Sequence, residues 1–306
     1  MKDESEHYDA MGLIADPEAL RAQADRDGFL FFRGLIPQDA LRALRAEVLE
    51  LVAEEGLLDE SHPRMEGWAN VPKAESMQHH GISCGTPELY RAVQRLERFH
   101  ALAHYPKLLD VYRILFEEEV LVHPRHIMRL MFPMQGVAPT DPHQDFIYID
   151  GTQSSWTSWI PIGDCPLELG NLTVLRGSHK AGVLPLRRGA AGAGGMETLI
   201  DGLAPDWVTF NFKAGDVLTF PSLAVHKSVP TQQPDRVRLS LDYRYQPQSE
   251  PVHESSLKVH MGALDWDDVY ARWEDDTHAY YWREQELDVV TGSYLQRHPE
   301  LVRNAD

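Results

Sequence analysis

The sequence is poor in cysteine, in basic residues and in long apolar runs, and each shortage excludes a class of protein. Its 306 residues include 2 cysteines, too few for a disulfide framework or a zinc cluster. Lys and Arg number 29 against 47 Asp and Glu, and the net charge of −18 disfavours nonspecific binding to nucleic acid or anionic membranes. No apolar run approaches the ~20 residues of a membrane span, and residues 1–6 lack a signal-peptide pattern. We therefore expect a cytoplasmic protein with small-molecule partners, no nucleic acid and no membrane; the oligomeric state cannot be inferred.

The N-terminal third of the chain has the pattern of helices around one strand. Apolar residues recur at helical spacing in four stretches: 16–26, 37–55, 89–103 and 105–117. Between the first two stretches, residues 28–35 predict a short buried strand. Residues 57–86 carry turn formers and no clear period, so we expect a long loop in which His79 and His80 are solvated.

After residue 118 the period shortens to that of strands. Strands are predicted at 127–132, 146–149, 156–162, 172–175, 207–212 and 217–220. This spacing favours an antiparallel sandwich or a jelly roll. The glycine-rich stretch 189–195 lacks the Lys-Ser/Thr of a phosphate loop and predicts a surface loop. We expect one domain over residues 1–306, with three regions: a helical N-terminal region over residues 1–118, a jelly-roll core at about 119–247 and a helical, aromatic-rich tail 248–306.

The stretch from Pro142 to Gly151 contains the strongest candidate for a metal site. In a strand, residues i and i+2 project to the same face, so His143 and Asp145 can share one ion. Two histidines and one carboxylate suit non-haem Fe(II) with open coordination positions. The third ligand must then be a distant histidine, and His226 is the candidate. The alternative for the pair alone is a surface histidine beside an acid in a turn.

Two further His-x-acid matches are expected to arise by chance. His7 and Asp9 lie in a charged N-terminal segment, and His298 and Glu300 flank a proline near the other end. Neither pair leads into a strand pattern, so we interpret both as decoys.

Residues 236–245 alternate strictly between polar and apolar side chains. The polar set shares one face of the predicted strand: Arg236, Arg238, Ser240, Asp242 and Arg244. Such a row can be a solvent face. Alternatively, a guanidinium beside a hydroxyl on a cavity wall is suited to binding a carboxylate.

Together, these residues resemble the phytanoyl-CoA dioxygenase family of Fe(II)/2-oxoglutarate oxygenases. The resemblance covers most of the chain and rests on these segments: His143-Gln144-Asp145, Trp159-Ile160-Pro161, residues 170–179, His226-Lys227-Ser228, and Arg238 followed by Tyr245. It implies a mainly β fold with flanking helices, the cupin-like double-stranded β-helix or jelly roll. It also implies Fe(II) held by His143, Asp145 and His226, with 2-oxoglutarate as co-substrate and O2 as oxidant.

The resemblance also assigns residues to the co-substrate site. Arg238, in an Arg-x-Ser pattern with Ser240, is expected to bind the distal carboxylate of 2-oxoglutarate, and Arg236 is its rival. Three more residues are expected to line this site: Ser228, Trp159 and Met128. The segment Gly177-Ser178-His179 is expected to order a loop rather than to catalyse.

The implied reaction is hydroxylation of an unactivated C–H bond, with 2-oxoglutarate converted to succinate and CO2. Asp145 fills the position that halogenases of this superfamily leave to chloride, so halogenation is not expected. The acidic charge disfavours an acyl-CoA, so we expect a small metabolite such as an amino-acid derivative, a terpenoid acid or a natural-product intermediate. Arg129, or Arg125 beside it, could hold a single carboxylate, although an ordinary strand-edge arginine is the alternative. The competing function is a catalytically silent relative, or a cupin-like barrel that binds a small ligand or a sugar.

Overall fold

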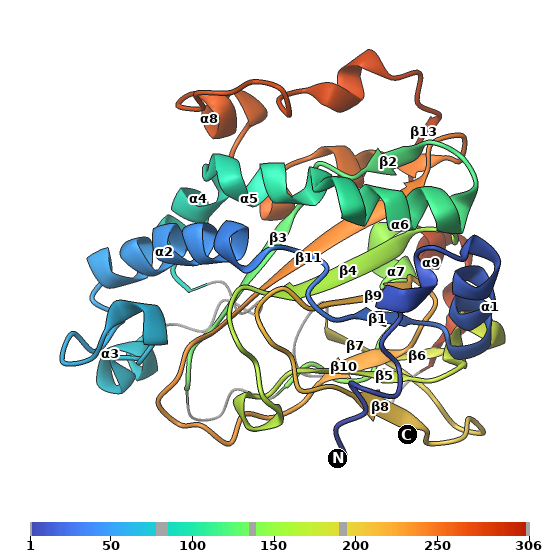
Figure 1. The fold of residues 1–306 in the computed structure, drawn as a ribbon. Helices are drawn as coiled ribbons and strands as arrows, with labels where there is room; N and C mark the ends of the chain where they lie inside the picture. Colours follow the sequence, from blue (N-terminus) through green and yellow to red (C-terminus); the bar gives the residue numbers. More distant parts are fainter. Residues whose placement is uncertain (1, 78–84, 135–138, 190–194, 304–306) are drawn as a thin grey trace.

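Two antiparallel sheets form the centre of the molecule, the larger above the smaller in Figure 1. The computed structural model describes residues 2–77, 85–134, 139–189 and 195–303. The larger sheet has the order β1-β9-β4-β11-β2, with β3 also paired to β11. Its strands are β1 (Leu30–Phe32), β9 (Val217–Pro221), β4 (Trp156–Pro161), β11 (Arg238–Pro247), β2 (Val120–Val122) and β3 (Ile127–Met131). The smaller sheet consists, in order, of β10 (His226–Ser228), β5 (Leu172–Leu175) and β8 (Trp207–Thr209).

Side chains alternate across the larger sheet, so each strand serves two layers. In β1, Leu30 and Phe32 pack toward the helices, while Phe31 packs toward the smaller sheet. The core between the sheets is largely aromatic and includes Phe29, Phe31, Trp159, Phe210, Phe212 and Phe220. β11 alternates in the same way from Arg238 onward, as predicted, with leucines and tyrosines toward the helices. Its polar face is therefore turned inward, toward the smaller sheet.

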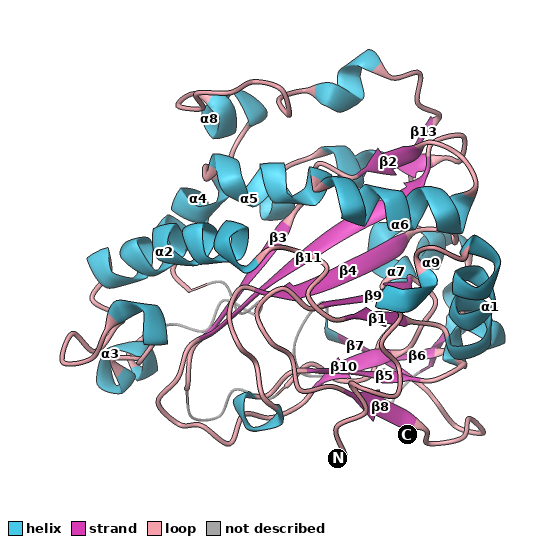
Figure 2. Ribbon diagram, viewed as in Figure 1, coloured by secondary structure: helices cyan, strands magenta, loops and turns pink. Residues whose placement is uncertain are grey.

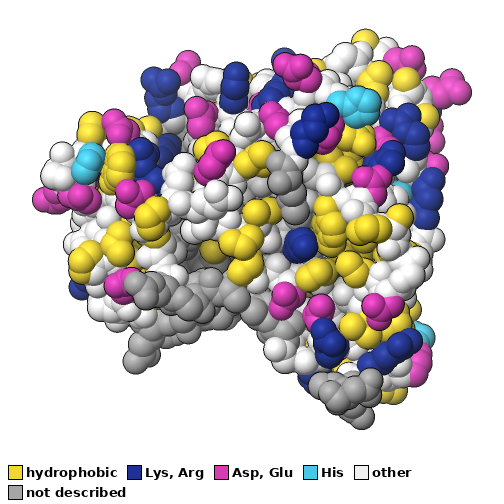
Figure 3. Space-filling model, turned by 90° about the horizontal axis from the view of Figure 1, so that it is seen from below, with side chains coloured by type: hydrophobic (Ala, Val, Ile, Leu, Met, Phe, Trp, Pro, Cys, Tyr) yellow, Lys and Arg dark blue, Asp and Glu magenta, His cyan; other side chains and the backbone are white. Residues whose placement is uncertain are grey.

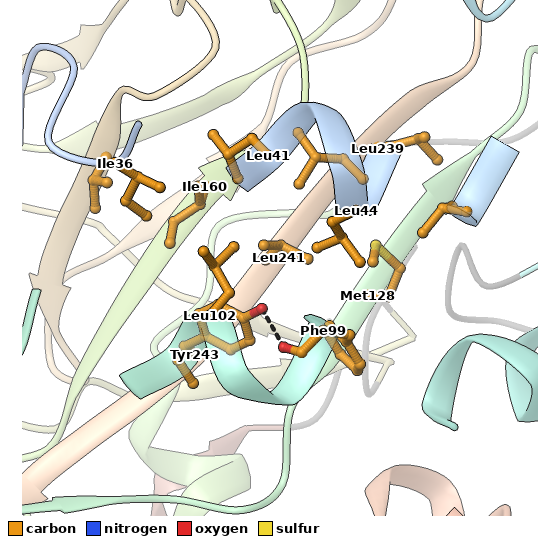
Figure 4. Packing of buried hydrophobic residues seen from close by; sticks show 14 of the residues in the cluster. Ile36, Leu41, Leu44, Phe99, Leu102, Met128, Ile160, Leu239, Leu241 and Tyr243 are labelled. Carbon is orange, nitrogen blue, oxygen red and sulfur yellow. Dashed lines mark hydrogen bonds between the residues drawn. The ribbon is translucent and has the colours of Figure 1, made fainter. Parts of the chain in front are cut away.

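Helices from the N-terminal third of the chain cover the outer face of the larger sheet (Figure 2). They are α1 (Pro17–Asp27), α2 (Gln38–Glu54), α4 (Pro87–Gln94), α5 (Glu97–Ala101) and α6 (Pro106–Phe116). Leu41 and Leu44 of α2 pack against Leu239 and Leu241 of β11 (Figure 4). Full burial of each leucine contributes roughly 1.5–3 kcal/mol. The hydroxyl of Tyr243 donates a hydrogen bond to the carbonyl of Phe99 at 2.5 Å, which ties α5 to the same strand.

The long helix predicted over 89–103 is interrupted: the structure has two helices there, α4 and α5. His100 Nε2 lies 2.8 Å from the carbonyl oxygen of Gln94, an oxygen that a continuous helix would offer to the amide of residue 98. Leu96 has an extended backbone with ψ 115° and precedes the second helix as its N-cap. The His100 side chain thus takes the place of one backbone amide that would bond to Gln94 in a continuous helix.

The predicted loop 57–86 contains a short helix, α3 (Val71–Glu75). Asn70 caps it by accepting a hydrogen bond from the amide of Lys73, and a proline lies in its first turn. Both are helix-start signals that the lack of an apolar period obscured. His79 and His80 lie outside the described residues, as does most of the glycine-rich stretch 189–195.

The tail is less helical than predicted, since its α-helices are only α8 (Trp266–Tyr270) and α9 (Tyr294–Arg297) within the described residues. The ring centroids of Trp266 and Trp282 are 4.8 Å apart, whereas a continuous helix would separate these residues by about 24 Å. The tail folds back so that its rings form a small core with Leu121 and Val252. Short strands complete the chain: β12 (Val252–His253), β13 (Val289–Val290), and the trio β6 (Leu186–Arg188), β7 (Met196–Thr198) and β14 (Val302–Arg303).

We propose that residues 1–306 form one domain. β1, from the predicted helical region, is an edge strand of the larger sheet, and the core of the tail includes Leu121 of β2. All three predicted regions therefore share buried surfaces. No helix in the described ranges is both long and apolar enough to cross a membrane.

Candidate metal centre

Two backbone hydrogen bonds hold His143 and His226 side by side. The amide of His143 donates to the carbonyl of His226 at 2.9 Å, and the amide of His226 donates back at 3.0 Å. The two residues form an isolated antiparallel bridge, and β10 continues from His226 along β5. Their ring centroids lie 4.1 Å apart. The smaller sheet thus brings together two histidines that are distant in the sequence.

Each imidazole uses Nδ1 for a backbone carbonyl and leaves Nε2 for another partner. His143 Nδ1 lies 2.8 Å from the Asp141 oxygen, and His226 Nδ1 lies 3.1 Å from the Ala224 oxygen. Because a carbonyl can only accept, Nδ1 carries the hydrogen and Nε2 presents a lone pair, as in metal-binding histidines. Burial, and then the neighbouring His226, lowers the pKa of His143 to about 3. Burial also lowers the pKa of His226, so both rings are neutral near pH 7.

Asp145 reaches the histidines from a turn, and the strand predicted over 146–149 is wrong. These residues form the short helix α7 (Phe146–Ile149), and Asp145 itself has helical angles, φ −65° and ψ −29°. Phe146, Ile147 and Ile149 are all buried, so the segment lacks the alternation that distinguishes a strand from a helix. Asp145 Oδ1 nevertheless lies 3.8 Å from His226 Nε2.

Two neighbours position Asp145 and keep it ionised. Thr157 Oγ1 donates a hydrogen bond to Oδ2 at 2.7 Å, and Arg244 Nη2 lies 3.4 Å from the same oxygen. Burial alone would raise the pKa of Asp145, but Arg244, the two histidines and Thr157 together lower it below its usual range. Oδ2 is thus occupied, which leaves Oδ1 for a cation.

The three side chains fit one metal ion. Ligand atoms of His143, Asp145 and His226 all lie within 4.8 Å of one another, the side chains are buried, and the described residues contain no other such group. Two neutral imidazole nitrogens and one ionised carboxylate are the donor set of non-haem Fe(II) sites with open positions. The predicted ligands therefore meet in one place and suit the predicted metal.

The decoy pairs have local partners instead. Asp9 accepts hydrogen bonds from the amides of Met11 and Arg33. His298 Nδ1 lies 3.1 Å from a carboxylate oxygen of Glu300. Neither pair has a third ligand among the described residues.

A cavity with about 470 Å³ of empty volume opens beside the three ligands, and four other predicted site residues line it: Arg129, Trp159, Ser228 and Arg238. Arg238 is 6% exposed, and its guanidinium carbon is 5.8 Å from the centre of the Trp159 ring. Asp242, on the same strand face, is ion-paired with Arg129 at 2.8 Å instead. A buried guanidinium without an acid is costly unless a ligand supplies the negative charge. Arg238 is therefore placed to bind an anion within reach of the metal ligands.

Met128 is not at this cavity, and the expectation that it lines the site is wrong. It lies in the helix-facing core near Leu44 and Leu241 (Figure 4), whereas its strand neighbours Arg129 and Met131 line the cavity. Because side chains alternate across a strand, the assignment missed by one residue.

Two further predicted residues have other surroundings than expected. Arg236 precedes β11, stacks 3.7 Å from the centre of the Trp68 ring and donates to the carbonyl of Glu66 at 2.9 Å. Ser240 is buried on the inward face of β11, and its hydroxyl has no hydrogen-bond partner among the described residues, but it does not line the cavity. Its role toward a co-substrate stays a prediction.

Sequence reasoning missed the residues that support the ligands. Thr157 precedes Trp159 by two positions in β4 and so shares its face, a signal that was available. Arg244 was placed on the correct face but given no role. Ser178 was correctly interpreted as structural, because its hydroxyl accepts a hydrogen bond from the amide of Val225 at 2.8 Å, one residue before His226.

Comparison with known proteins agrees with this geometry. The chain is 26% identical over 280 residues to the 1-deoxypentalenic acid 11-beta-hydroxylase of Streptomyces exfoliatus, covering 85% of this chain and 94% of that one. It is 28% identical over 262 residues to the enzyme of the same name from Streptomyces arenae, covering 80% and 86%.

The fold recurs in the crystal structure of the epimerase SnoN in complex with Fe3+, alpha ketoglutarate and nogalamycin RO, with a TM-score of 0.57 at 20% identity over 78% of this chain and 86% of that one. The predicted jelly roll is thereby confirmed. The model of the phytanoyl-CoA dioxygenase (PhyH) family matches residues 24–237. The chain belongs to the phytanoyl-CoA dioxygenase family, as its sequence predicted.

Proposed function

We propose that this protein is an Fe(II)/2-oxoglutarate-dependent oxygenase that hydroxylates an unactivated C–H bond of a small metabolite. The substrate C–H, O2 and 2-oxoglutarate become an alcohol, succinate and CO2, so one atom of O2 enters the alcohol and the other enters succinate. The observation that supports this most strongly is the buried set of His143, Asp145 and His226 in one cavity with Arg238. A sugar-binding barrel would not require a buried arginine opposite three metal ligands.

His143, Asp145 and His226 would hold the iron, which supplies the oxidising chemistry with 2-oxoglutarate and O2. The protein prepares this site before any ligand arrives. Hydrogen bonds from Nδ1 to backbone carbonyls orient both imidazoles, and Thr157 orients the carboxylate. Such supporting contacts commonly change metal affinity or activity by 10–100-fold.

Arg238 would bind the distal carboxylate of 2-oxoglutarate through a charge-assisted fork. Trp159 and Ser228 line the same cavity and would flank the co-substrate. Because Arg238 is nearly fully buried, the pair would form in a site from which most water is excluded, and such a setting strengthens the attraction between the two charges.

The substrate is proposed to be a small metabolite in the cytoplasm, rather than an acyl-CoA, a nucleic acid or a membrane lipid. Two relatives carry the name of a hydroxylase acting on one small acid, which supports hydroxylation. In Figure 3, Lys and Arg side chains are interspersed with Asp and Glu over the face shown, with no continuous basic groove for several phosphates. The net charge of −18 also disfavours a substrate that carries several phosphates.

The test is Fe(II)-dependent formation of succinate from 2-oxoglutarate, followed by mass spectrometry of a stimulating substrate under labelled O2. We expect one labelled oxygen in the product, even in chloride buffer. The Zn(II)-loaded protein is the control, because zinc can occupy the ligands without redox chemistry. A protein that binds 2-oxoglutarate and iron but forms no succinate would be a silent relative, and a chlorinated main product would contradict the role of Asp145.

A further inference from the structure

Arg125 is a largely buried cation with no carboxylate partner in the described residues. It lies in the segment between β2 and β3, and its amide donates to the carbonyl of Ser256 at 3.3 Å. Its Nε is buried without a hydrogen-bond partner. The internal segments 78–84, 135–138 and 190–194, which the structure does not describe, contain no Asp or Glu. They cannot supply the missing negative charge.

The neighbouring arginines, by contrast, are compensated. Arg129 pairs with Asp242 at 2.8 Å, and Arg244 lies 3.4 Å from Asp145. Burial, and then the nearby Arg244, lowers the pKa of Arg125 to about 10, so the guanidinium is still charged at neutral pH. After each acid has been assigned to its arginine, Arg125 is left uncompensated among the described residues, as is Arg238, which is assigned to 2-oxoglutarate.

His260 is a polar neighbour of Arg125 that carries no negative charge. His260 Nδ1 forms a hydrogen bond of 2.5 Å with the hydroxyl of Tyr90. Burial, and then Arg125, Arg129 and Arg244 in that order, lowers the pKa of His260 to about 2, which places all three guanidiniums within electrostatic reach of this ring. His260 is therefore neutral, and the surroundings favour an anion.

We propose that Arg125 binds a carboxylate of the substrate, so that the enzyme selects small monoanionic acids. This inference rests on the proposed function. Arg125 does not line the cavity that contains Arg238, so it is separate from the site assigned to 2-oxoglutarate and would bind the substrate instead. A planar guanidinium matches a carboxylate in a bidentate fork. One uncompensated cation matches one negative charge, whereas a CoA thioester would bring several.

The amide of His123, two residues before Arg125, donates to the carbonyl of Arg244 at 2.9 Å, and the guanidinium of Arg244 lies 3.4 Å from Asp145. The segment that carries Arg125 therefore runs along the strand that supports the metal ligands. The carboxylate would then fix the substrate at one end and leave its hydrocarbon part to lie toward the metal. Arg125 would in this way act as a specificity-determining and positioning residue. It would not touch the reacting C–H bond.

The test uses a panel of terpenoid and other small carboxylic acids, each paired with its methyl ester and with the corresponding primary amine. Succinate release is measured with the wild-type enzyme and with Arg125→Gln, Arg125→Lys and Arg113→Gln. Arg113 is an exposed arginine of α6 that pairs with Asp110, so its variant is the matched control. We expect acids to stimulate release more than their esters or amines in the wild type.

In Arg125→Gln we expect the KM for a stimulating acid to rise roughly 30-fold or more, with little change for its ester. Arg125→Lys should restore part of the preference, and Arg113→Gln all of it. The proposal is overturned if no acid stimulates release, if the ester serves equally well, or if Arg125→Gln keeps the acid preference. Where a variant does not fold, acid and ester are still compared in the wild type, and an equal response to both overturns the proposal.

Failure of the proposed function would look different. Wild-type enzyme that forms no succinate from 2-oxoglutarate with Fe(II), with or without panel compounds, would refute the oxygenase assignment itself. Wild-type enzyme that forms succinate but prefers esters or amines would refute only the role of Arg125.

Discussion

The two faces of β11 show how one strand can separate stability from function. Toward the helices, Leu239, Leu241 and Tyr243 are buried in an apolar layer. Toward the smaller sheet, Arg238 and Arg244 are buried almost as deeply, at 6% and 7% exposed. Apolar burial stabilises the fold, whereas buried charge is costly unless it is paired. The inward face thus gives up stability in order to hold ions and ligands.

The largest effect should come from the ligands themselves. His143→Ala, Asp145→Ala and His226→Ala should each lower Fe(II)-dependent succinate release by more than about 100-fold, because loss of a ligand should exceed the loss of its supporting contact. Thermal unfolding of the metal-free variants should stay close to that of the wild type. His7→Ala and His298→Ala are the controls. An inactive control variant, or a fully active ligand variant, would contradict the assignment of the three metal ligands.

On the inward face of β11, Arg238→Ala should raise the 2-oxoglutarate concentration required for half-maximal turnover. Loss of a charge-assisted fork in a partly dry site costs on the order of 2–4 kcal/mol, which is about 30-fold to 1,000-fold. Arg236→Ala, which removes the stacking on Trp68, should change this value little. The reverse ranking would mean that Arg236 supplies the co-substrate contact.

Sequence reasoning succeeded where local pattern and tertiary structure agree. The alternation of residues 238–245 and the helical spacing of apolar residues within 37–55 each agree with the face that is buried. The ligands were found because an iron site needs a particular set of donors, whatever the backbone. Asp145 occupies a helical turn instead of a strand, so the three side chains meet as predicted although the reasoning from strand geometry was wrong.

The misses occurred where distant contacts decide the local structure. The break near Leu96 depends on a bond from His100 to the carbonyl of Gln94, and the folded tail depends on contact between rings at both of its ends. The pairing of Arg129 with Asp242 joins β3 to β11. None of these contacts can be inferred from neighbours in sequence, and the Arg129 pairing decides which arginine is left for a substrate.

A substitution on the helix-facing side should have the opposite signature to Arg238→Ala. Leu241→Ala removes a fully buried side chain from the apolar layer and should lower the free energy of unfolding by about 2–5 kcal/mol. The KM for 2-oxoglutarate should change little at temperatures where the variant is folded. Ser240→Ala, the adjacent change on the inward face, is the stability control and should cost much less. If Leu241→Ala altered the KM as strongly as Arg238→Ala, the two faces would not be separable.

The helix-facing layer also contains buried histidines. The ring centroids of His100 and His126 are 5.1 Å apart, and His126 lies 4.9 Å from the Tyr243 ring. Burial lowers the pKa of His100 to about 4 and that of His126 well below its ordinary value. Between about pH 4 and pH 6.5 the unfolded chain therefore binds protons at these positions that the folded chain does not bind.

The smallest predicted effect is a pH dependence of stability that His126 helps to produce. Because the unfolded state gains the protons, the free energy of unfolding should fall as the pH drops from 7.5 to 5.5, by about 1.4 kcal/mol for each such histidine. Carboxylates contribute little in this window, since unfolded Asp and Glu titrate near or below pH 4.3. His126→Phe, which keeps a ring among the aromatic neighbours, should reduce the difference between the two pH values by about that amount, whereas His7→Phe at an exposed position should not. Urea unfolding at both pH values measures this difference, and an unchanged slope in His126→Phe would show that the acid sensitivity arises elsewhere, such as at the metal-site histidines.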